Sequence, residues 1–499
     1  MRQRITGLVI VGVLATLAWE LPQVRRRMLQ DVTRRDAVPS EPAALPGGAG
    51  VGLSPSPRTR VVLIDGLSAR AASTMRAWQA LCARGVAVTV DVGFPTVSLP
   101  VEVTLWSGLT QQQTGIVNNH DEGPLEPPLR GIPSQLPDSW VVAENHGWIV
   151  RSLGFAQIEP AADVTDHPTD AAGKARRAAW EAAWRARARA AVASPAQLAF
   201  VHILSVDSAG HAHGGDSPEY RAAAQAADEV VDTLVAAAPS ARWFLLSDHG
   251  HLGGPRGGHG GEERDVRQVG SCLAGAGLPM RRGGLVHLAD IARAIADSTG
   301  TTLDHEARGR PLSAALAAPL APDDALPAMT LGSGAIAILV LAAGIALTIV
   351  FARVFWLVPW WFVLACVALV MIRGEPTLST PFIYKPEGRD MYLVWLPLLA
   401  LAVAATWFGV RRTTLPRVVV AQLALPFAAV ATAITACGGW TAVLGADVAP
   451  VVPRFTAYTS PLLLMASHGA AAVALAALAT LVRPVFGRRG PPEPPRTAP

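Results

Sequence analysis

Three apolar runs in this chain each lead directly into an aspartate. The pairs of run and aspartate are Val61–Ile64 with Asp65, Leu198–Val206 with Asp207, and Trp243–Ser247 with Asp248. Helical patterns separate the runs, the longest of them over Ala171–Ala193 and Ser217–Ala238. Strands that alternate with helices predict an α/β domain with a mostly parallel central sheet. Because ligands bind at the carboxyl ends of the strands in such sheets, we expect the three aspartates to lie at one site.

Shorter patterns predict the remaining elements of this domain. The predicted elements are helices over Ala69–Arg84, Pro100–Trp106 and Leu285–Ser298 and a strand over Val86–Val92. Pro100 suits the first turn of its helix, and Gly108 suits the position just after the helix ends.

Histidines gather around the three aspartates. In chain order, the acidic and imidazole side chains are Asp65, Asp207, His211, Asp248, His249 and His259. We expect a turn after the strand over Leu198–Val206 to bring His211 back beside Asp207. Carboxylate oxygen and imidazole nitrogen are the ligands of zinc, and they also suit manganese or iron. The set is large enough for two ions, and two metals roughly 4 Å apart suit displacement at phosphorus.

A nucleophile is expected near Asp65. Thr96, in the segment Phe94–Pro100, lies just before a predicted helix. Backbone N–H groups at a helix N-terminus attract a phosphoryl oxygen, and a metal-bound hydroxyl ionises near neutral pH and attacks as an alkoxide. The alternative interpretation makes Thr96 an ordinary helix cap.

Other titratable side chains near the motifs receive no part in metal binding. His202 falls inside a predicted strand and is expected in the core. His213 and His251 fit no ligand position, so we expect them to be solvated or to support the ligands. Glu102 and Glu262 lie near the motifs without an assigned role.

The order of the motifs resembles the alkaline phosphatase superfamily. Between Arg58 and Ala318 the chain carries Asp-Gly, Pro-Thr, Asp-x-x-x-His, Asp-His-Gly and His-Gly-Gly in that order. The resemblance implies a first metal ion held by Asp207, His211 and His259. It implies a second ion held by Asp65, Thr96, Asp248 and His249, with Thr96 as the covalent nucleophile. Two divalent ions are therefore expected, zinc first and manganese as the alternative.

Two branches of that superfamily share features with this chain. The segment Thr96–Asn119 is similar to nucleotide pyrophosphatase/phosphodiesterases, and the resemblance makes Asn118, with Asn119 beside it, the candidate for binding a phosphoryl oxygen. The segment Asp207–Tyr220 looks like the ethanolamine-phosphate transferases of GPI-anchor assembly, which also join an N-terminal span and an extracytoplasmic or lumenal domain to a multi-span C-terminus. The sulfatase branch is disfavoured, because Thr96 stands where cysteine or serine is needed for formylglycine.

The order of an N-terminal span, a catalytic domain and several C-terminal spans favours a phosphotransferase. The resemblance implies that a phosphoethanolamine-type headgroup passes from a phospholipid donor, through Thr96, to an acceptor hydroxyl on an unidentified glycan or lipid. An extracytoplasmic phosphodiesterase or nucleotide pyrophosphatase that releases its product to water is the alternative. A non-catalytic membrane scaffold with a relic enzyme domain is the alternative of another class, which all seven intact ligand positions disfavour.

The composition indicates a membrane protein with a soluble domain. The 499 residues are 51% hydrophobic and 16% charged, and the apolar excess lies near the N-terminus and in the last third. Ile5–Trp19 reads as an uncleaved signal anchor, with a cleaved signal peptide as the alternative. Five further spans are predicted at Leu331–Phe351, Val354–Ile372, Met391–Val410, Val418–Cys437 and Ser460–Val482.

These features divide the chain into five parts. In order, they are an anchor (residues 1–24), a flexible linker (25–57), an alkaline-phosphatase-like catalytic domain (58–325), a transmembrane domain of five helices (326–484) and a cytoplasmic tail (485–499).

The distribution of basic residues predicts the orientation. One set of connections between spans holds eight Lys or Arg residues and the other set holds four. Because positive charge stays in the cytoplasm, both termini are expected there and the catalytic domain outside, in a bacterial-type cell membrane. The run Arg25–Arg27 opposes this assignment. We attribute the net charge of +4 to these membrane flanks and expect no nucleic-acid partner.

Four cysteines give no disulfide framework and no Cys-based zinc site. Cys366 and Cys437 fall inside predicted spans. Cys82 and Cys272 lie in the soluble part, where a single bridge between them stays open.

Overall fold

The computed structural model describes the predicted domain and a few residues outside it. The described residues are 5, 8, 9, 11–20, 23, 52–116, 119, 127–145, 147–159, 170–253, 258–261, 263–320, 471, 474 and 478. They belong to two compact units, which are taken separately below.

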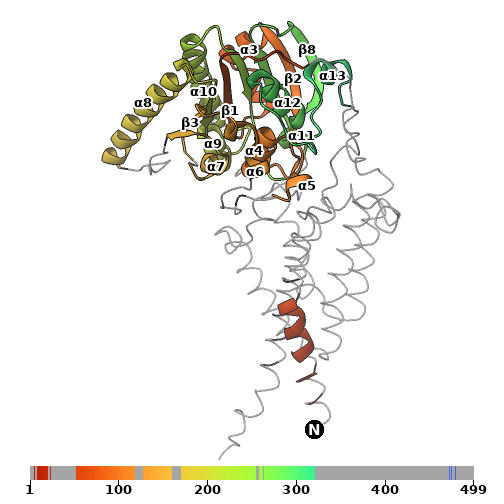
Figure 1. Ribbon diagram of the computed structural model, residues 1–499. Helices are drawn as coiled ribbons and strands as arrows, with labels where there is room; N and C mark the ends of the chain where they lie inside the picture. Colours follow the sequence, from red (N-terminus) through yellow and green to blue (C-terminus); the bar gives the residue numbers. More distant parts are fainter. Residues whose placement is uncertain are drawn as a thin grey trace, which may run out of the picture. The chain divides into compact units, whose positions relative to one another are not determined.

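A single eight-stranded sheet forms the centre of the domain, in the order β4-β3-β5-β1-β6-β7-β2-β8 (Figure 1). The strands are β1 Thr59–Ile64, β2 Gly85–Asp91, β3 Trp140–Ala143, β4 Gln157–Glu159, β5 Leu198–Ile203, β6 Arg242–Leu246, β7 Gln268–Ala274 and β8 Arg281–His287. Among these pairings only those of β7 are antiparallel. The prediction of an α/β domain with a mostly parallel sheet is therefore confirmed.

Helices cover both faces of this sheet. They are α2 Ala69–Ala72, α3 Arg76–Cys82, α4 Ser98–Ser107, α5 Gln111–Thr114, α6 Pro127–Ser134, α7 Gly147–Ser152, α8 Ala171–Ala193, α9 Ser205–His213, α10 Pro218–Ala237, α11 Arg264–Arg267, α12 Leu288–Thr299 and α13 Leu312–Ala317. Alternate residues of β1 enter two different apolar clusters. Val61 and Leu63 join the one that contains α4 and α12, and Val62 and Ile64 join the one that contains α3, α8 and α10. Strand β1 is accordingly buried along its whole length.

Three predicted elements differ from the structure. The predicted strand Leu198–Val206 ends at Ile203, so Asp207 lies in the first turn of helix α9 rather than at a strand end. The helix starts early because the carboxylate of Glu144 accepts hydrogen bonds from the backbone N–H groups of Leu204 and Ser205, at 2.8 and 2.9 Å. These orphan donors at a helix N-terminus need such a partner, and the sequence near Asp207 does not supply it.

The second difference lies near the end of the domain. The predicted helix Leu285–Ser298 begins at Leu288, because the three residues before it belong to strand β8. His287 caps the helix, accepting from the N–H of Ala289, while Asp290 accepts from the N–H of His287. The third difference is the predicted helix Ala69–Arg84, which is divided into α2, ending at Ala72, and α3, beginning at Arg76. Strands β3, β4, β7 and β8 have no counterpart among the predicted strands.

A disulfide joins Cys82 at the end of α3 to Cys272 in β7. Their Cα atoms are 4.8 Å apart although 190 residues separate them in sequence. The bridge that the sequence leaves open is thus formed in the structure.

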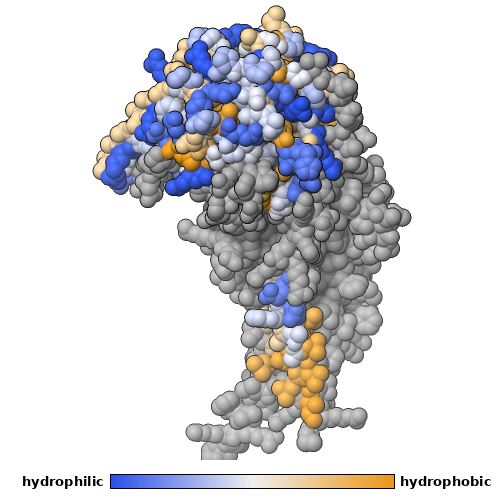
Figure 2. Space-filling model, in the orientation of Figure 1, coloured by the Kyte–Doolittle hydropathy of each residue, from blue (hydrophilic) through white to orange (hydrophobic). Residues whose placement is uncertain are grey.

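The other unit contains a helix near the N-terminus. Figure 2 shows hydrophobic side chains on its surface, where Ile5, Leu8, Val9, Val13 and Trp19 are each more than half exposed. Leu14 packs against Ala474. Within the described residues, no helix is both long and apolar enough to cross a membrane. Apart from residues 471, 474 and 478, the five predicted spans lie outside the described residues.

Candidate metal centre

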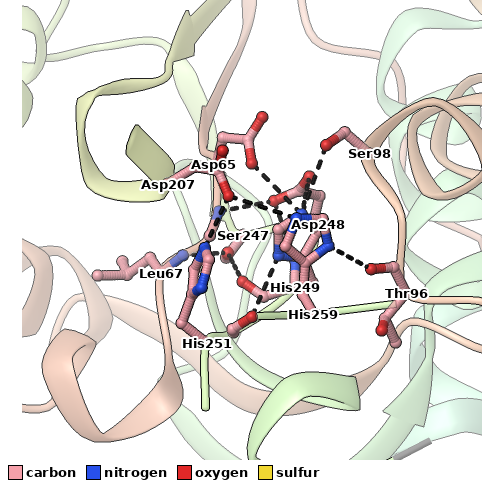
Figure 3. A network of polar contacts seen from close by, with 12 residues as sticks. Asp65, Leu67, Thr96, Ser98, Asp207, Ser247, Asp248, His249, His251 and His259 are labelled. Carbon is pink, nitrogen blue, oxygen red and sulfur yellow. Dashed lines mark hydrogen bonds and ion pairs between the residues drawn. The ribbon is translucent and has the colours of Figure 1, made fainter. Parts of the chain in front are cut away.

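The predicted site residues meet at one edge of the sheet (Figure 3). Asp65 follows β1 directly, and Asp248 and His249 follow β6. Strand β1 pairs in parallel with both β5 and β6, so the ends of the three strands lie side by side. Asp207 reaches the same edge from helix α9, which follows β5.

Four side chains form what we call the first ligand group. They are Asp207, His211, His251 and His259, whose metal-donor atoms all lie within 4.8 Å of one another. Helix α9 places Asp207 and His211 four residues apart on one face, with His211 Nε2 3.5 Å from Asp207 Oδ2. The Nε2 atoms of His211 and His259 are only 3.1 Å apart. Two such nitrogens face one another only with a proton or a cation between them.

Three side chains form the second ligand group. Asp65, Asp248 and His249 are all fully buried. His249 Nε2 lies 3.4 Å from Asp65 Oδ1 and 3.2 Å from Asp248 Oδ2. Neither oxygen of Asp65 nor Oδ2 of Asp248 has a hydrogen-bond partner within the described residues. The nearest donors to these oxygens are imidazole nitrogens at 3.2 to 3.4 Å, which leaves much of the cost of burying the carboxylates. A bound cation would remove that cost, so the residues fit a metal ion.

The two groups adjoin one another. Donor atoms of Asp65, Asp207 and His249 also lie within 4.8 Å of one another, which links Asp207 to the second group. The rings of His249 and His259 stack with their centroids 3.6 Å apart. The site is therefore one continuous cluster with two sets of ligands.

Backbone carbonyls orient two of the imidazoles. His259 Nδ1 donates to the carbonyl oxygen of Thr96 at 2.8 Å, and His249 Nδ1 donates to that of Gly250 at 3.2 Å. Each ring then presents the lone pair of Nε2 to the cluster, which is the arrangement of a metal-ligating histidine. Burial lowers the pKa of His249 to about 3. Burial, followed by the proximity of His249, lowers the pKa of His259 well below its usual range.

The carboxylates of the cluster differ in their affinity for protons. Burial, followed by the charges of Asp248 and Asp207, raises the pKa of Asp65 well above its usual range. Burial also raises the pKa of Asp248 to about 6. For Asp207, burial acts in the same direction, but His211 and His251 outweigh it and hold the pKa well below its usual range.

Thr96 is fully buried beside the loop that carries His259. Its hydroxyl donates to the carbonyl oxygen of Gly261 at 2.8 Å and accepts from the N–H of Gly260 at 2.9 Å. Helix α4 begins two residues later and its N-cap is Val97, so the alternative interpretation of Thr96 as the cap is wrong.

The other residues near the motifs differ in their relation to the cluster. Ser98 Oγ lies 3.4 Å from His249 Nε2. Asn118 lies outside the described residues, but Asn119 Oδ1 accepts from the N–H of Leu99 at 3.0 Å and so holds the start of α4. Glu262 also lies outside the described residues, and His213 is exposed as expected.

His251 contacts a proposed ligand, which is one of the two roles expected for it. Its Nε2 lies 2.7 Å from Asp207 Oδ1, and the side chain is buried. The short loop that returns from β6 places His251 beside Asp207. Its position two residues after His249 was the one available signal.

His202 and Glu102 are the other two side chains without a predicted role that approach the cluster. His202 is buried as expected, yet it contacts Asp65 and Glu102 through Nε2, at 3.4 and 3.1 Å. Burial opposes its charged form, but Glu102 and Asp65 outweigh burial and raise the pKa of His202 well above its usual range.

The fold and the cluster define an α/β domain with candidate metal ligands at the carboxyl edge of a mostly parallel sheet. Residues 59–263 match the family model described as type I phosphodiesterase / nucleotide pyrophosphatase. This domain therefore belongs to the alkaline phosphatase superfamily, which is a superfamily of metal-dependent enzymes. The expectations of an enzyme and of this superfamily are confirmed.

Solved structures that are similar to this chain come from several branches. Murine ectonucleotide pyrophosphatase / phosphodiesterase 5 is 14% identical, with a TM-score of 0.38 over 50% of this chain and 97% of that one. A 2-O GAG sulfatase is 16% identical, with a TM-score of 0.43 over 52% and 74%. Phosphonate monoester hydrolase of Agrobacterium radiobacter is 15% identical, with a TM-score of 0.37 over 54% and 78%. No curated protein matches the chain.

Proposed function

We propose that this protein is a membrane-bound, two-metal phosphotransferase that acts on phosphodiesters through a covalent intermediate on Thr96. One observation carries the proposal. Two contiguous ligand groups lie at one edge of the sheet, and the loop that supplies His259 also holds the hydroxyl of Thr96. Nucleophile and ligands are thus fixed to one another by short hydrogen bonds.

Each side chain has a defined part in this proposal. Asp207, His211 and His259 would hold one ion, and Asp65, Asp248, His249 and Thr96 the other. Bound zinc, or manganese as the alternative, lowers the pKa of a coordinated hydroxyl and offsets charge on phosphoryl oxygens. The N–H of Gly260 already donates to Thr96 Oγ1 and would favour its alkoxide form. Asn118 remains the candidate for binding a phosphoryl oxygen.

The chemistry then follows in two displacements. Thr96 Oγ1 bonds to phosphorus, the bond from phosphorus to the lipid oxygen breaks, and diacylglycerol leaves. The headgroup, as a phosphodiester on Thr96, passes to the hydroxyl of a glycan or lipid acceptor, and the threonine hydroxyl is regenerated. We take phosphatidylethanolamine as the donor. Holding the catalytic domain beside its lipid donor would convert a rare encounter into an oriented one.

The proposed location is the outer side of a cell membrane, with both termini in the cytoplasm. The basic residues of the predicted connections between spans support it, as above. The Cys82–Cys272 disulfide also supports it, because disulfides persist in oxidising compartments outside the cytoplasm.

Hydrolysis is the second candidate function, because the matched family is named for phosphodiesterases and nucleotide pyrophosphatases. Product analysis separates the two. Zinc-loaded full-length protein is incubated with phosphatidylethanolamine labelled in the headgroup, in membranes that contain acceptor lipids. Label on a lipid or glycan supports transfer, and label only as free phosphoethanolamine supports hydrolysis. If the protein turns over neither phosphatidylethanolamine nor nucleotide phosphodiesters, the result supports the alternative of a non-catalytic membrane scaffold.

A further inference from the structure

Three ionisable side chains lie together in the interior behind the second ligand group. Asp65 follows β1, His202 belongs to β5, and Glu102 belongs to helix α4; each is 0% exposed. Burying three such groups is expensive unless each one stabilises another. Their position against a proposed metal ligand therefore calls for a function.

The two oxygens of the Asp65 carboxylate contact different histidines. Its Oδ2 lies 3.4 Å from His202 Nε2, and its Oδ1 lies 3.4 Å from His249 Nε2. His202 Nε2 is also 3.1 Å from Glu102 Oε1. The same nitrogen of His202, Nε2, thus contacts both an interior carboxylate and the one that faces the second ligand group.

The backbone around His202 is rigid. Strand β5 lies between β1 and β3, and the N–H of Glu144 donates to the carbonyl oxygen of His202 at 2.9 Å. The N–H of Asp65 donates to the carbonyl oxygen of Ile203 at 2.8 Å. The ring also packs edge-on against Phe200. A ring fixed in this way can define the orientation of a neighbouring carboxylate.

Glu102 connects this arrangement to the nucleophile. It is the fifth residue of α4, the helix that begins two residues after Thr96. A shift of α4 would move Thr96 and Glu102 together. The contact from Glu102 through His202 to Asp65 therefore ties the nucleophile's helix to a ligand of the second group.

We propose that Glu102 and His202 are positioning residues: Glu102 holds the ring of His202, and His202 holds Asp65 Oδ2 so that Oδ1 faces the second ligand group. This inference rests on the proposed metal-binding function. Partners that orient a metal ligand typically contribute 10- to 100-fold in metal affinity. Loss of His202 should therefore weaken metal binding at the second group by about that factor and leave the first group nearly unchanged.

The test is a calorimetric zinc titration of metal-free full-length protein. His202→Leu removes the contact, and His202→Gln restores an N–H donor near the position of Nε2. Glu102→Gln keeps the shape of that side chain and removes its charge. Leu198→Ala is the matched control, because Leu198 is buried four residues earlier on the same strand and joins the same apolar cluster. Thermal unfolding of each metal-free variant reports whether it folds.

Two binding events are expected in the wild type. His202→Leu should weaken one of them about 10- to 100-fold, His202→Gln should recover most of that loss, and Leu198→Ala should change neither event. Unchanged affinities in His202→Leu and Glu102→Gln would overturn the inference. So would equal losses in Leu198→Ala. A third bound zinc that disappears with His202 would also overturn it, because donor atoms of Asp65, Glu102 and His202 lie within 4.8 Å of one another as well. If His202→Leu does not fold, the zinc affinities of Glu102→Gln and His202→Gln test the inference.

The same titration separates this inference from the proposed function. A wild-type protein that binds no zinc contradicts the proposed function itself. A wild-type protein that binds two ions, with variants that bind them equally well, contradicts only the positioning roles of Glu102 and His202.

Discussion

The two ligand groups share one edge of the sheet but differ in their exposure to solvent. In the first group, His211 is 47% exposed and lies on a helix, whereas Asp65, Asp248 and His249 of the second group are fully buried after strand ends. The first group is held by histidines and a carboxylate that stays ionised. The second group depends on two carboxylates that burial drives toward protonation. Because the first group has one exposed ligand, His211, and the second has none, we expect metal exchange and substrate entry at the first group and tight metal retention at the second.

The largest expected effect comes from removing a ligand of the buried group. Asp65→Asn should abolish one of two zinc-binding events and reduce turnover to background, because the amide cannot offset the charge of the ion. His211→Asn should weaken the other event while the second group still binds. Metal content after dialysis, measured per chain, checks both variants. Loss of both ions in each variant would show that the groups do not bind independently.

The pH dependence should also separate the two groups. The pKa of Asp248 is raised to about 6 by burial, and that of Asp65 is raised as well. Metal binding must displace these protons, so affinity at the second group should fall as pH falls through about 6, roughly tenfold per pH unit for each proton. Metal affinity at the first group should fall less over the same pH range, because the pKa values of Asp207 and His259 are lowered. Calorimetry in buffers of different ionisation enthalpy counts the protons released. No proton release at pH 5 would contradict this difference.

The smallest effect is expected from His251, which belongs to the first ligand group but which the proposed function leaves out of the metal ligands. At 2.7 Å its Nε2 hydrogen-bonds Asp207 rather than sharing a metal with it, because two ligands of one zinc ion lie farther apart. His251→Gln, which keeps a donor near that position, should retain most of the zinc affinity, and His251→Leu should lose about tenfold. X-ray absorption of the zinc protein counts the coordinating histidines. A spectrum that loses one histidine per chain in His251→Gln would make His251 a ligand instead.

The aspartates of the second ligand group are easier to predict from the sequence than Asp207 or the residues that contact the ligands. Asp65 and Asp248 follow buried apolar runs, and a strand that ends in a charged residue is visible in a single sequence. Asp207 was placed at a strand end because the helix start depends on Glu144, which lies 63 residues earlier in the chain. A distant carboxylate that caps a helix leaves no local pattern.

The contacts of Glu102 and His202 could not be predicted for a similar reason. His202 sits in a run of apolar residues, which indicates burial and says nothing of what the ring faces. Glu102 lies in a helix that is buried on all sides. Their meeting depends on how α4 crosses the end of β5, which is a property of tertiary packing. The resemblance to a known family names motif residues and leaves such partners out.

The most direct test of the central claim is the mass of the intact protein during turnover. Zinc-loaded full-length protein is mixed with phosphatidylethanolamine, quenched in acid within the first turnover and fragmented. We predict an added phosphoethanolamine group on Thr96. We also predict that Thr96→Ala keeps the zinc ion of the first group, binds the second ion more weakly because one ligand is missing, and loses activity by on the order of 10⁴-fold or more. An unmodified Thr96 during active turnover, or a Thr96→Ala variant with full turnover, would contradict it.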